Sequence, residues 1–249
     1  MEDGIPFEIA NLKRRPDLAE EFGRMSQGAW PPFLLHADTL YWDSLFDEFA
    51  GFQFAFLDPE GAVIATGHTV PFIWDGTEDD LPLKLSEALG RGLEAHRQGH
   101  APDTLSALAA IVAPDHQRKG LSTRIIRTMR SLAVDHGMHS LLAPVRPTLK
   151  SLYPLTPFER YVEWKREDGT PFDPWLRVHH RLGAQFMKVA PQAITVTGSV
   201  TEWEEWTGVR FPESGEYVVP GALQSVHIDR DCDEGRCDDP NVWMRHPVP

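Results

Sequence analysis

The stretch APDHQRKGLSTRIIRTM, residues 113–129, lies where an apolar run gives way to a helical pattern. Residues 104–113, TLSALAAIVA, are mostly apolar, which is typical of a strand buried at the centre of a sheet. Beyond the turn, Leu121, Ile125 and Met129 recur at helical spacing and predict an amphipathic helix. The sequence therefore predicts a strand, a short turn and a helix in direct succession.

The run SLLAPV at residues 140–145 follows that helix and reads as a second buried strand. A strand, a helix and a strand within about forty residues form the unit that places two strands side by side in parallel. We therefore expect one parallel strand pair, formed by the apolar runs on either side of the helix.

The turn HQRKGLS combines features that bind phosphate. The first N–H groups of a helix have no partner within the helix, and together with the helix dipole they favour an anion. Gly120 has no Cβ to hold a phosphate away, and Arg118 and Lys119 add positive charge beside it. The alternative is a basic turn in which the Ser122 hydroxyl caps the helix. The turn matches neither G-x-x-x-x-G-K-[ST] nor G-x-G-x-x-G, so a nucleotide site of either kind is not expected.

The turn resembles the signature R/Q-x-x-G-x-G/A of the GNAT acyltransferases, in which Gln117, Gly120 and Ser122 match the spacing. Serine replaces the usual glycine or alanine at the last position. The resemblance spans about residues 5–190 and implies a mixed α/β (α+β) fold, with a central, mostly antiparallel sheet, one parallel pair and flanking helices. It also implies acetyl-CoA or another acyl-CoA as donor. By position, the residues expected to bind it are Ile111, Val112 and Ala113 along the pantetheine, and Gln117, Arg118, Lys119, Gly120, Leu121, Ser122 and Thr123 around the pyrophosphate.

The resemblance also suggests catalytic groups. Many members have a tyrosine near the end of the fourth helix that protonates the departing thiolate, and His179 occupies that position in VHHRLGAQF. The ordinary histidine pKa near 6.5 suits proton exchange at neutral pH. A backbone N–H of a bulged strand around residues 111–113 is expected to stabilise the oxyanion. His68, Asp75, Glu78 or a water chain remain alternatives for the base, because the strand before the turn has no carboxylate.

Composition restricts the partners. The chain has 249 residues, and 37 acidic against 24 basic residues give a net charge of −13. This charge disfavours non-specific binding to nucleic acid or to anionic membranes. The start, MEDGIPFEIA, has neither a basic region nor an apolar core of a signal peptide, and no apolar run approaches 18 residues, so a cytoplasmic location is expected.

No metal site is expected. The two cysteines, Cys232 and Cys237, lack the second pair that a zinc site needs. The surrounding DRDCDEGRCDDPN also fails as a calcium loop, because its glycine falls one place late and Pro240 stands where a bidentate glutamate belongs. A solvated acidic loop is the expected structure.

We expect a single domain over residues 1–249. The remaining pattern predicts a strand at 7–12, a helix after Pro16, a second helix from Thr39 to Phe49, a hairpin around DPEG at 58–61, a helix at 84–98, a helix and a strand in DPWLRVHHRLGAQFMKVA, and late strands in AITVTGSV and GEYVVPG. The core is expected over about 5–200, with an insertion at 146–172 and a C-terminal extension over about 200–249.

These features favour an N-acyltransferase, most simply an N-acetyltransferase, that modifies an amine of a small molecule. Two alternatives keep the same fold: an acyltransferase that works with an acyl carrier protein, and a non-catalytic acyl-CoA-binding module. A homodimer contact through the C-terminal residues is a further expectation. Two groups of aromatic residues are candidates for the wall of the acceptor pocket: Trp30, Phe33, Tyr41 and Trp42, and Tyr153, Phe158, Tyr161 and Trp164.

Overall fold

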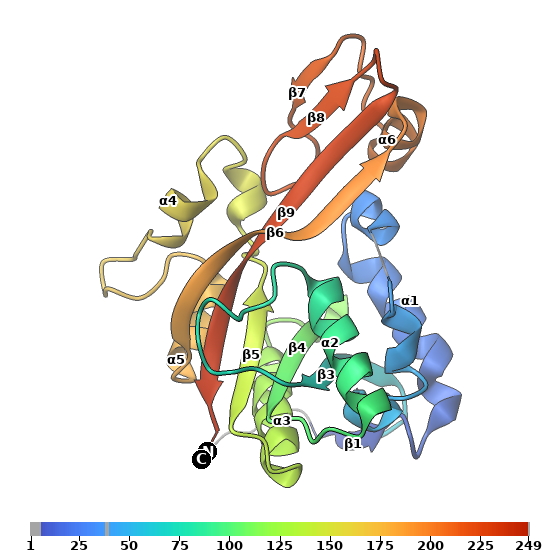
Figure 1. Cartoon of the computed structure of the whole chain (residues 1–249), viewed down its shortest axis with the longest axis vertical. Coiled ribbons are helices and arrows are strands. Elements are labelled where there is room, and N and C mark those ends of the chain that lie inside the picture. Colours follow the sequence, from blue (N-terminus) through green and yellow to red (C-terminus); the bar gives the residue numbers. More distant parts are fainter. Residues whose placement is uncertain (1–5, 38–39, 249) are drawn as a thin grey trace.

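A computed structural model describes residues 6–37 and 40–248. Nine strands form one sheet in the order β1-β2-β3-β4-β5-β9-β8-β7, and β6 pairs with β9 (Figure 1). The strands are β1 (Glu8–Asn11), β2 (Phe54–Leu57), β3 (Val63–Phe72), β4 (Thr104–Val112), β5 (Ser140–Val145), β6 (Gln185–Gly198), β7 (Gly215–Tyr217), β8 (Val226–Asp229) and β9 (Glu234–Pro247). The α-helices are α1 (Ala19–Ala29), α2 (Leu85–Gln98), α3 (Leu121–Asp135), α4 (Phe158–Val162), α5 (Pro174–Arg181) and α6 (Val200–Thr207).

The sheet is antiparallel except between β4 and β5, which are parallel. This confirms the expected mixed fold with one parallel pair, formed by the two apolar runs that flank α3. The hairpin around residues 58–61 is also confirmed, since β2 and β3 pair across it. Gly61 adopts a φ of 86°, which the turn requires and which glycine tolerates without strain.

Helices cover both faces of the sheet. On one face α3 packs Ile125 and Met129 against Leu105 of β4. On the other face α2 packs Leu89 against Val70 of β3 and neighbouring residues. Helix α1 also lies on the α2 face, where Phe22 contacts the ring of His68. The two faces therefore present different helices to any ligand that reaches the sheet.

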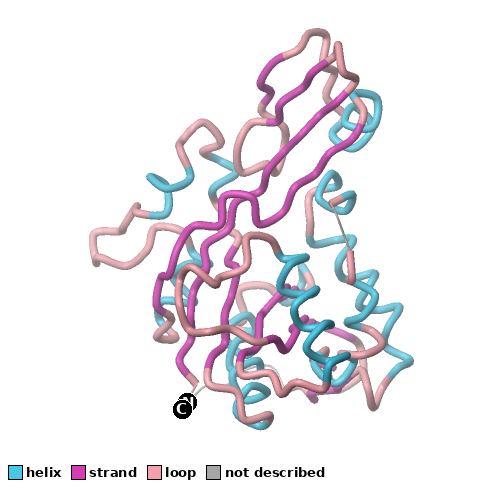
Figure 2. Tube along the Cα trace, in the orientation of Figure 1, coloured by secondary structure: helices cyan, strands magenta, loops and turns pink. Residues whose placement is uncertain are grey.

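The C-terminal segment belongs to the central sheet, which corrects the expected extension over 200–249. Strand β9 lies between β5 and β6, with Val145 paired to Val242. Its first half continues beyond the core with β6, β7, β8 and α6 and forms a lobe, drawn at the top of Figures 1 and 2. Residues 199–233, between β6 and β9, thus lie in this lobe together with the end of β6 and the start of β9.

Residues 40–49 do not form the α-helix that was expected from Thr39 to Phe49. Thr39 lies outside the described residues, and the segment after it contains short 3-10 turns at Trp42–Leu45 and Ala50–Phe52. Tyr41 precedes the first of them with a φ of 69°, which an α-helix does not accommodate. Within residues 6–37 and 40–248, no helix combines the length and apolar character needed to cross a bilayer.

Candidate functional site

The turn between β4 and α3 has the conformation that the phosphate hypothesis requires. Arg118 has a φ of 61° and Gly120 a φ of 80°, so two left-handed residues direct the chain from the strand onto the helix. Gly120 is the N-cap of α3, and no side chain caps the helix. The alternative of Ser122 as a capping residue is therefore wrong, because Ser122 already lies in the first helical turn.

The start of α3 is open to an anion. The first intrahelical bond joins the Arg124 N–H to the Gly120 carbonyl at 3.3 Å, which leaves the N–H groups of residues 121–123 ahead of the helical ladder. A Cβ built on Gly120 meets no atom within 4 Å, and Arg118 and Lys119 are exposed. Backbone donors, an open approach and two cations thus fit a pyrophosphate.

A wedge opens between β4 and β5 beside this turn. The two strands pair only from Thr104 to Ser106, opposite Ser140 to Leu142. Strand β4 continues to Val112 with β3 on one side, and beyond Ser106 none of the described strands pairs with its other edge. Unpaired backbone groups along this edge are available to an extended ligand such as pantetheine.

The register decides which residues face the wedge. The Ala113 N–H donates to the Ile64 carbonyl at 3.0 Å, so this pair points its backbone groups at β3. Because these groups alternate along an antiparallel strand, Ile111 also points at β3, whereas Ala110 and Val112 point into the wedge. The Val112 carbonyl already accepts from Gln117 Nε2 at 3.4 Å. Of the three residues expected to bind pantetheine, 111 to 113, Val112 therefore directs its backbone groups into the wedge, and Ala110 does so as well.

The bulge of β4 lies earlier than expected. The register shifts between His68 and Thr69, which pair with Ala109 and Ala107 and leave Leu108 as the extra residue. The bulge is thus next to the closed end of the wedge, where β4 leaves β5. Because a bulge frees backbone groups from the ladder, an N–H near Leu108 is a further candidate for the oxyanion donor beside those expected around residues 111–113.

His179 of α5 is a buried residue, 1% exposed. Its Nδ1 lies 2.8 Å from Nε2 of His246 on β9, and its ring packs edge-on against Trp175. Burial and then His246 lower the pKa of His179 to about 3, so the imidazole is neutral at neutral pH. The argument from an ordinary pKa near 6.5 is therefore wrong. This side chain can protonate a thiolate only with a proton that it has first accepted during the reaction.

Comparison with known proteins identifies the family. No family model matches the chain. The chain is 34% identical to the arginine N-acetyltransferase avaD of Aspergillus versicolor, an alignment that covers 97% of this chain and 94% of that protein. The chain belongs to the GNAT N-acetyltransferases. The enzyme transfers an acetyl group from acetyl-CoA to a small amine.

Solved structures show the same fold for this GNAT enzyme. The loading GNATL domain of CurA from Lyngbya majuscula aligns with a TM-score of 0.64 at 15% identity, over 98% of both chains. The GphF GNAT-like decarboxylase, solved with isobutyryl-CoA, aligns with a TM-score of 0.61 at 16% identity, over 98% of this chain and 100% of the other.

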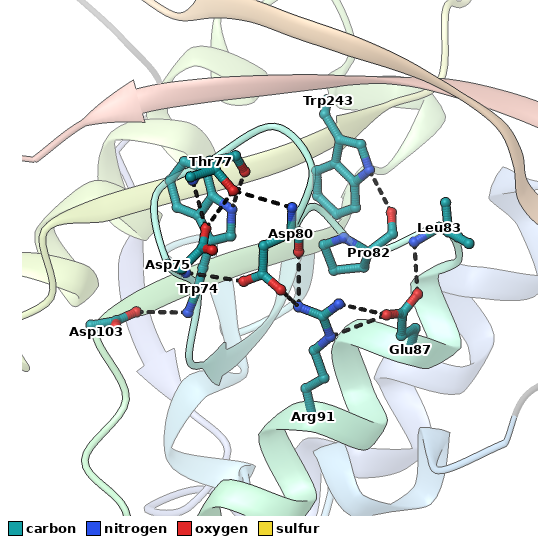
Figure 3. A network of polar contacts seen from close by, with 10 residues as sticks. All are labelled: Trp74, Asp75, Thr77, Asp80, Pro82, Leu83, Glu87, Arg91, Asp103 and Trp243. Atoms are coloured by element: carbon teal, nitrogen blue, oxygen red, sulfur yellow. Dashed lines mark hydrogen bonds and ion pairs between the residues drawn. The ribbon is translucent and has the colours of Figure 1, made fainter.

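The acidic turn after β3, one of the suggested sources of a base in this acetyltransferase, has a structural role. Asp75 accepts hydrogen bonds from the N–H and the hydroxyl of Thr77, both at 2.7 Å, and these bonds lower its pKa (Figure 3). Asp80 anchors the same turn to Arg91 of α2 at 2.9 Å. One oxygen of Asp75 is therefore occupied as the acceptor that holds the turn, which disfavours Asp75 as the base. No contact of the Glu78 side chain distinguishes it as a base.

The two aromatic groups have different positions. Phe33 is buried in the lobe against Trp203, with Trp30 beside that cluster, so neither forms a separate pocket wall. Tyr41 is exposed, whereas Trp42 lies 5.8 Å from the ring of His68.

In the insertion, Tyr153, Tyr161, Trp164 and Phe172 pack on one another with ring centroids 5.0–6.2 Å apart. Phe158, the remaining member, is buried in the main core beside α5. The insertion aromatics thus hold their own segment together, whereas Trp42 lies beside His68, which pairs with Ala109 at the bulge of β4.

Proposed function

We propose that the acceptor of this enzyme is arginine or a closely related small guanidino amine. The nearly full-length similarity to an arginine N-acetyltransferase supports this acceptor. The net charge of −13 is also suited to a cationic substrate, because a negative potential attracts a cation to the protein. The carrier-protein partner and the homodimer contact suggested by the sequence stay predictions.

The donor site follows from the turn and the wedge, and their geometry is the observation that supports the reaction most directly. The pyrophosphate of acetyl-CoA binds the N–H groups at the start of α3, with Arg118 and Lys119 beside it. The pantetheine extends along the free edge of β4 past Val112 and Ala110. The thioester then reaches the bulge at Leu108, where backbone N–H groups stabilise the oxyanion.

The acyl transfer proceeds by attack of the amine nitrogen on the thioester carbon. A C–N bond forms and the carbonyl electrons move to oxygen, and on collapse the C–S bond breaks and the thiolate leaves. The thiolate takes up one proton and a second proton is released to solvent, since the acceptor enters the reaction from its ammonium form. His179 is the proposed donor to the thiolate, through its Nε2, which has no hydrogen-bond partner in the described structure.

Turnover with arginine and loss of donor binding test the proposal. Wild-type protein should release CoA from acetyl-CoA in the presence of arginine, and mass spectrometry should show monoacetylated arginine. Gly120→Glu should abolish both turnover and the rise in melting temperature with CoA, because it places a carboxylate and a strained left-handed residue at the phosphate site. Gly169→Glu, the same substitution at another left-handed glycine in an exposed turn of the insertion, is the control and should retain both. CoA stabilisation without acetylation of arginine would contradict the acceptor alone.

A further inference from the structure

His68 of β3 is a buried polar side chain with no polar partner. It is 1% exposed, and neither Nδ1 nor Nε2 has a hydrogen bond within the described structure. Burial alone lowers its pKa to about 4, so the ring is neutral at neutral pH. A buried polar group that lacks partners costs free energy, and an apolar side chain of similar size would serve the core better. The presence of an imidazole at this position therefore indicates a chemical role and not only a contribution to core packing.

The position of His68 relates it to the reaction. It pairs with Ala109 at the point where the register shifts, so it lies directly beside the bulge at Leu108. The bulge in turn adjoins Ser106, the last residue of β4 that pairs with β5. His68 is thus on the strand next to the closed end of the wedge. In the proposed function the thioester binds at this same end, beside the bulge at Leu108.

The surroundings of His68 are aromatic and lie on the face opposite α3. Phe22 of α1 meets the imidazole edge-on at 5.1 Å between ring centroids, and Trp42 and Phe46 follow at 5.8 and 6.2 Å. Trp42 and Phe46 are only half-buried, so His68 lies one side chain below the surface. A small amine that displaces or passes these rings reaches the ring nitrogens without unfolding the core.

We propose that His68 is the general base of the acetyl transfer and accepts a proton from the acceptor amine beside the bulge of β4. This inference rests on the proposed function. The apolar surroundings that keep the imidazole neutral also favour the neutral form of an entering amine, which leaves its first proton in solvent. As the C–N bond forms, a second proton passes from the amine nitrogen to His68. The imidazolium then returns that proton to solvent. His179 takes up one proton from solvent and passes it to the thiolate, so one proton is released overall.

Three variants test this role. His68→Leu removes the base and fills the site with an apolar side chain, and it should lower kcat/KM at least about 100-fold, the range of general base catalysis. Its melting temperature and its stabilisation by CoA should not fall. Thr66→Val is the matched control: Thr66 lies on the same strand two residues away, and its Oγ1 is also buried without a partner. It should retain kcat/KM within about twofold.

Chemical rescue separates a base from a packing residue. His68→Ala should lose activity and regain it with added imidazole in a saturable manner, because the lost ring leaves a space that the acceptor path reaches. Rates are measured with whichever amine the wild-type enzyme acetylates, so a wrong acceptor does not affect the result. The proposal would be overturned if His68→Leu folded and kept more than one tenth of the wild-type kcat/KM. It would also be overturned if His68→Ala folded, lost activity and was not rescued by imidazole.

Discussion

His68, His179 and His246 are all buried, and in each the environment keeps the imidazole neutral. Burial is the first cause in every case, and it brings the pKa of His68 and of His246 to about 4 and that of His179 to about 3. In the unfolded chain the same side chains return to a pKa near 6.5. The folded protein therefore holds three proton acceptors in a form that acid destabilises.

Acid should lower the stability of this enzyme through these histidines. Because the folded pKa values lie below the unfolded ones, the unfolded chain binds more protons below about pH 6.5, and the free energy of unfolding decreases as the pH falls. A single such histidine accounts for about 1.6 kcal/mol between pH 6.5 and pH 5. Urea unfolding at the two pH values should show this loss, and in His68→Leu the loss should be smaller by about that amount. An identical loss in both proteins would mean that His68 titrates normally.

The turn before α3 was predictable from neighbouring residues, but the environment of each histidine was not. Gly120 and its neighbours lie within seven residues of sequence, so their spacing alone indicates a phosphate-binding turn. The pKa of His179 depends on His246, which is 67 residues away, and on burial by α5 and β9. The missing partners of His68 depend in the same way on how α1 and the turn at Trp42 pack. Local spacing contains no information on either.

At the scale of elements, Asp173 joins the insertion to α5. Its Oδ1 accepts from the N–H groups of Trp175 and Leu176 at the start of the helix, at 2.9 and 3.3 Å. Its Oδ2 accepts from the Leu149 N–H at 2.8 Å and from the Tyr161 hydroxyl at 2.9 Å. One carboxylate, 1% exposed, therefore caps a helix and fixes both ends of the inserted segment.

Removal of this carboxylate should loosen the insertion. Asp173→Ala leaves four donors without their acceptor and should lower the free energy of unfolding by about 3 kcal/mol. Trypsin should then cleave faster at Lys150, Arg160 and Lys165 in the native protein. Asp168→Ala, in an exposed turn of the same insertion, is the control and should change stability by less than about 0.5 kcal/mol. Unchanged cleavage in Asp173→Ala would show that the aromatic cluster holds the segment without it.

Elements with local turn signals were predicted well, and those set by distant pairing were not. The hairpin of β2 and β3 follows from Asp58 to Gly61, whose residues determine the turn. Strand β9 contains Pro240 and Asn241, which indicate a turn by sequence. In the structure they lie where β6 bulges between Ala190 and Ile194, and a bulge accommodates a proline inside a strand. The insertion of β9 between β5 and β6 is a long-range pairing that no local pattern shows.

At the scale of the whole molecule, β9 belongs to both the core and the lobe. Met244 and Val242 lie in the core beside α3 and α5, whereas Cys237 lies in the lobe with Trp203 and Ile228. The strand is continuous over 14 residues, and β6 pairs with it in both parts. The acetyl-CoA wedge is formed by β4 and β5, and β9 is the strand next to β5. A substitution that destabilises the lobe is therefore expected to destabilise the sheet that contains the wedge as well, because both share β9.

The lobe and the core should therefore unfold in one step. Trp203 is fully buried in the lobe, and its ring contacts the backbone of β9 so closely that a Cβ on Gly235 would lie 2.2 Å from it. Trp203→Ala should cost about 3–5 kcal/mol. Native-state hydrogen exchange should then show an equal loss of protection at Ile228 in the lobe and at Leu141 and Leu142 of β5. Trp206→Ala, a half-buried residue of the same helix, should cause a smaller loss in both places. Protection that falls only at Ile228 would show that β9 does not couple the lobe to the wedge.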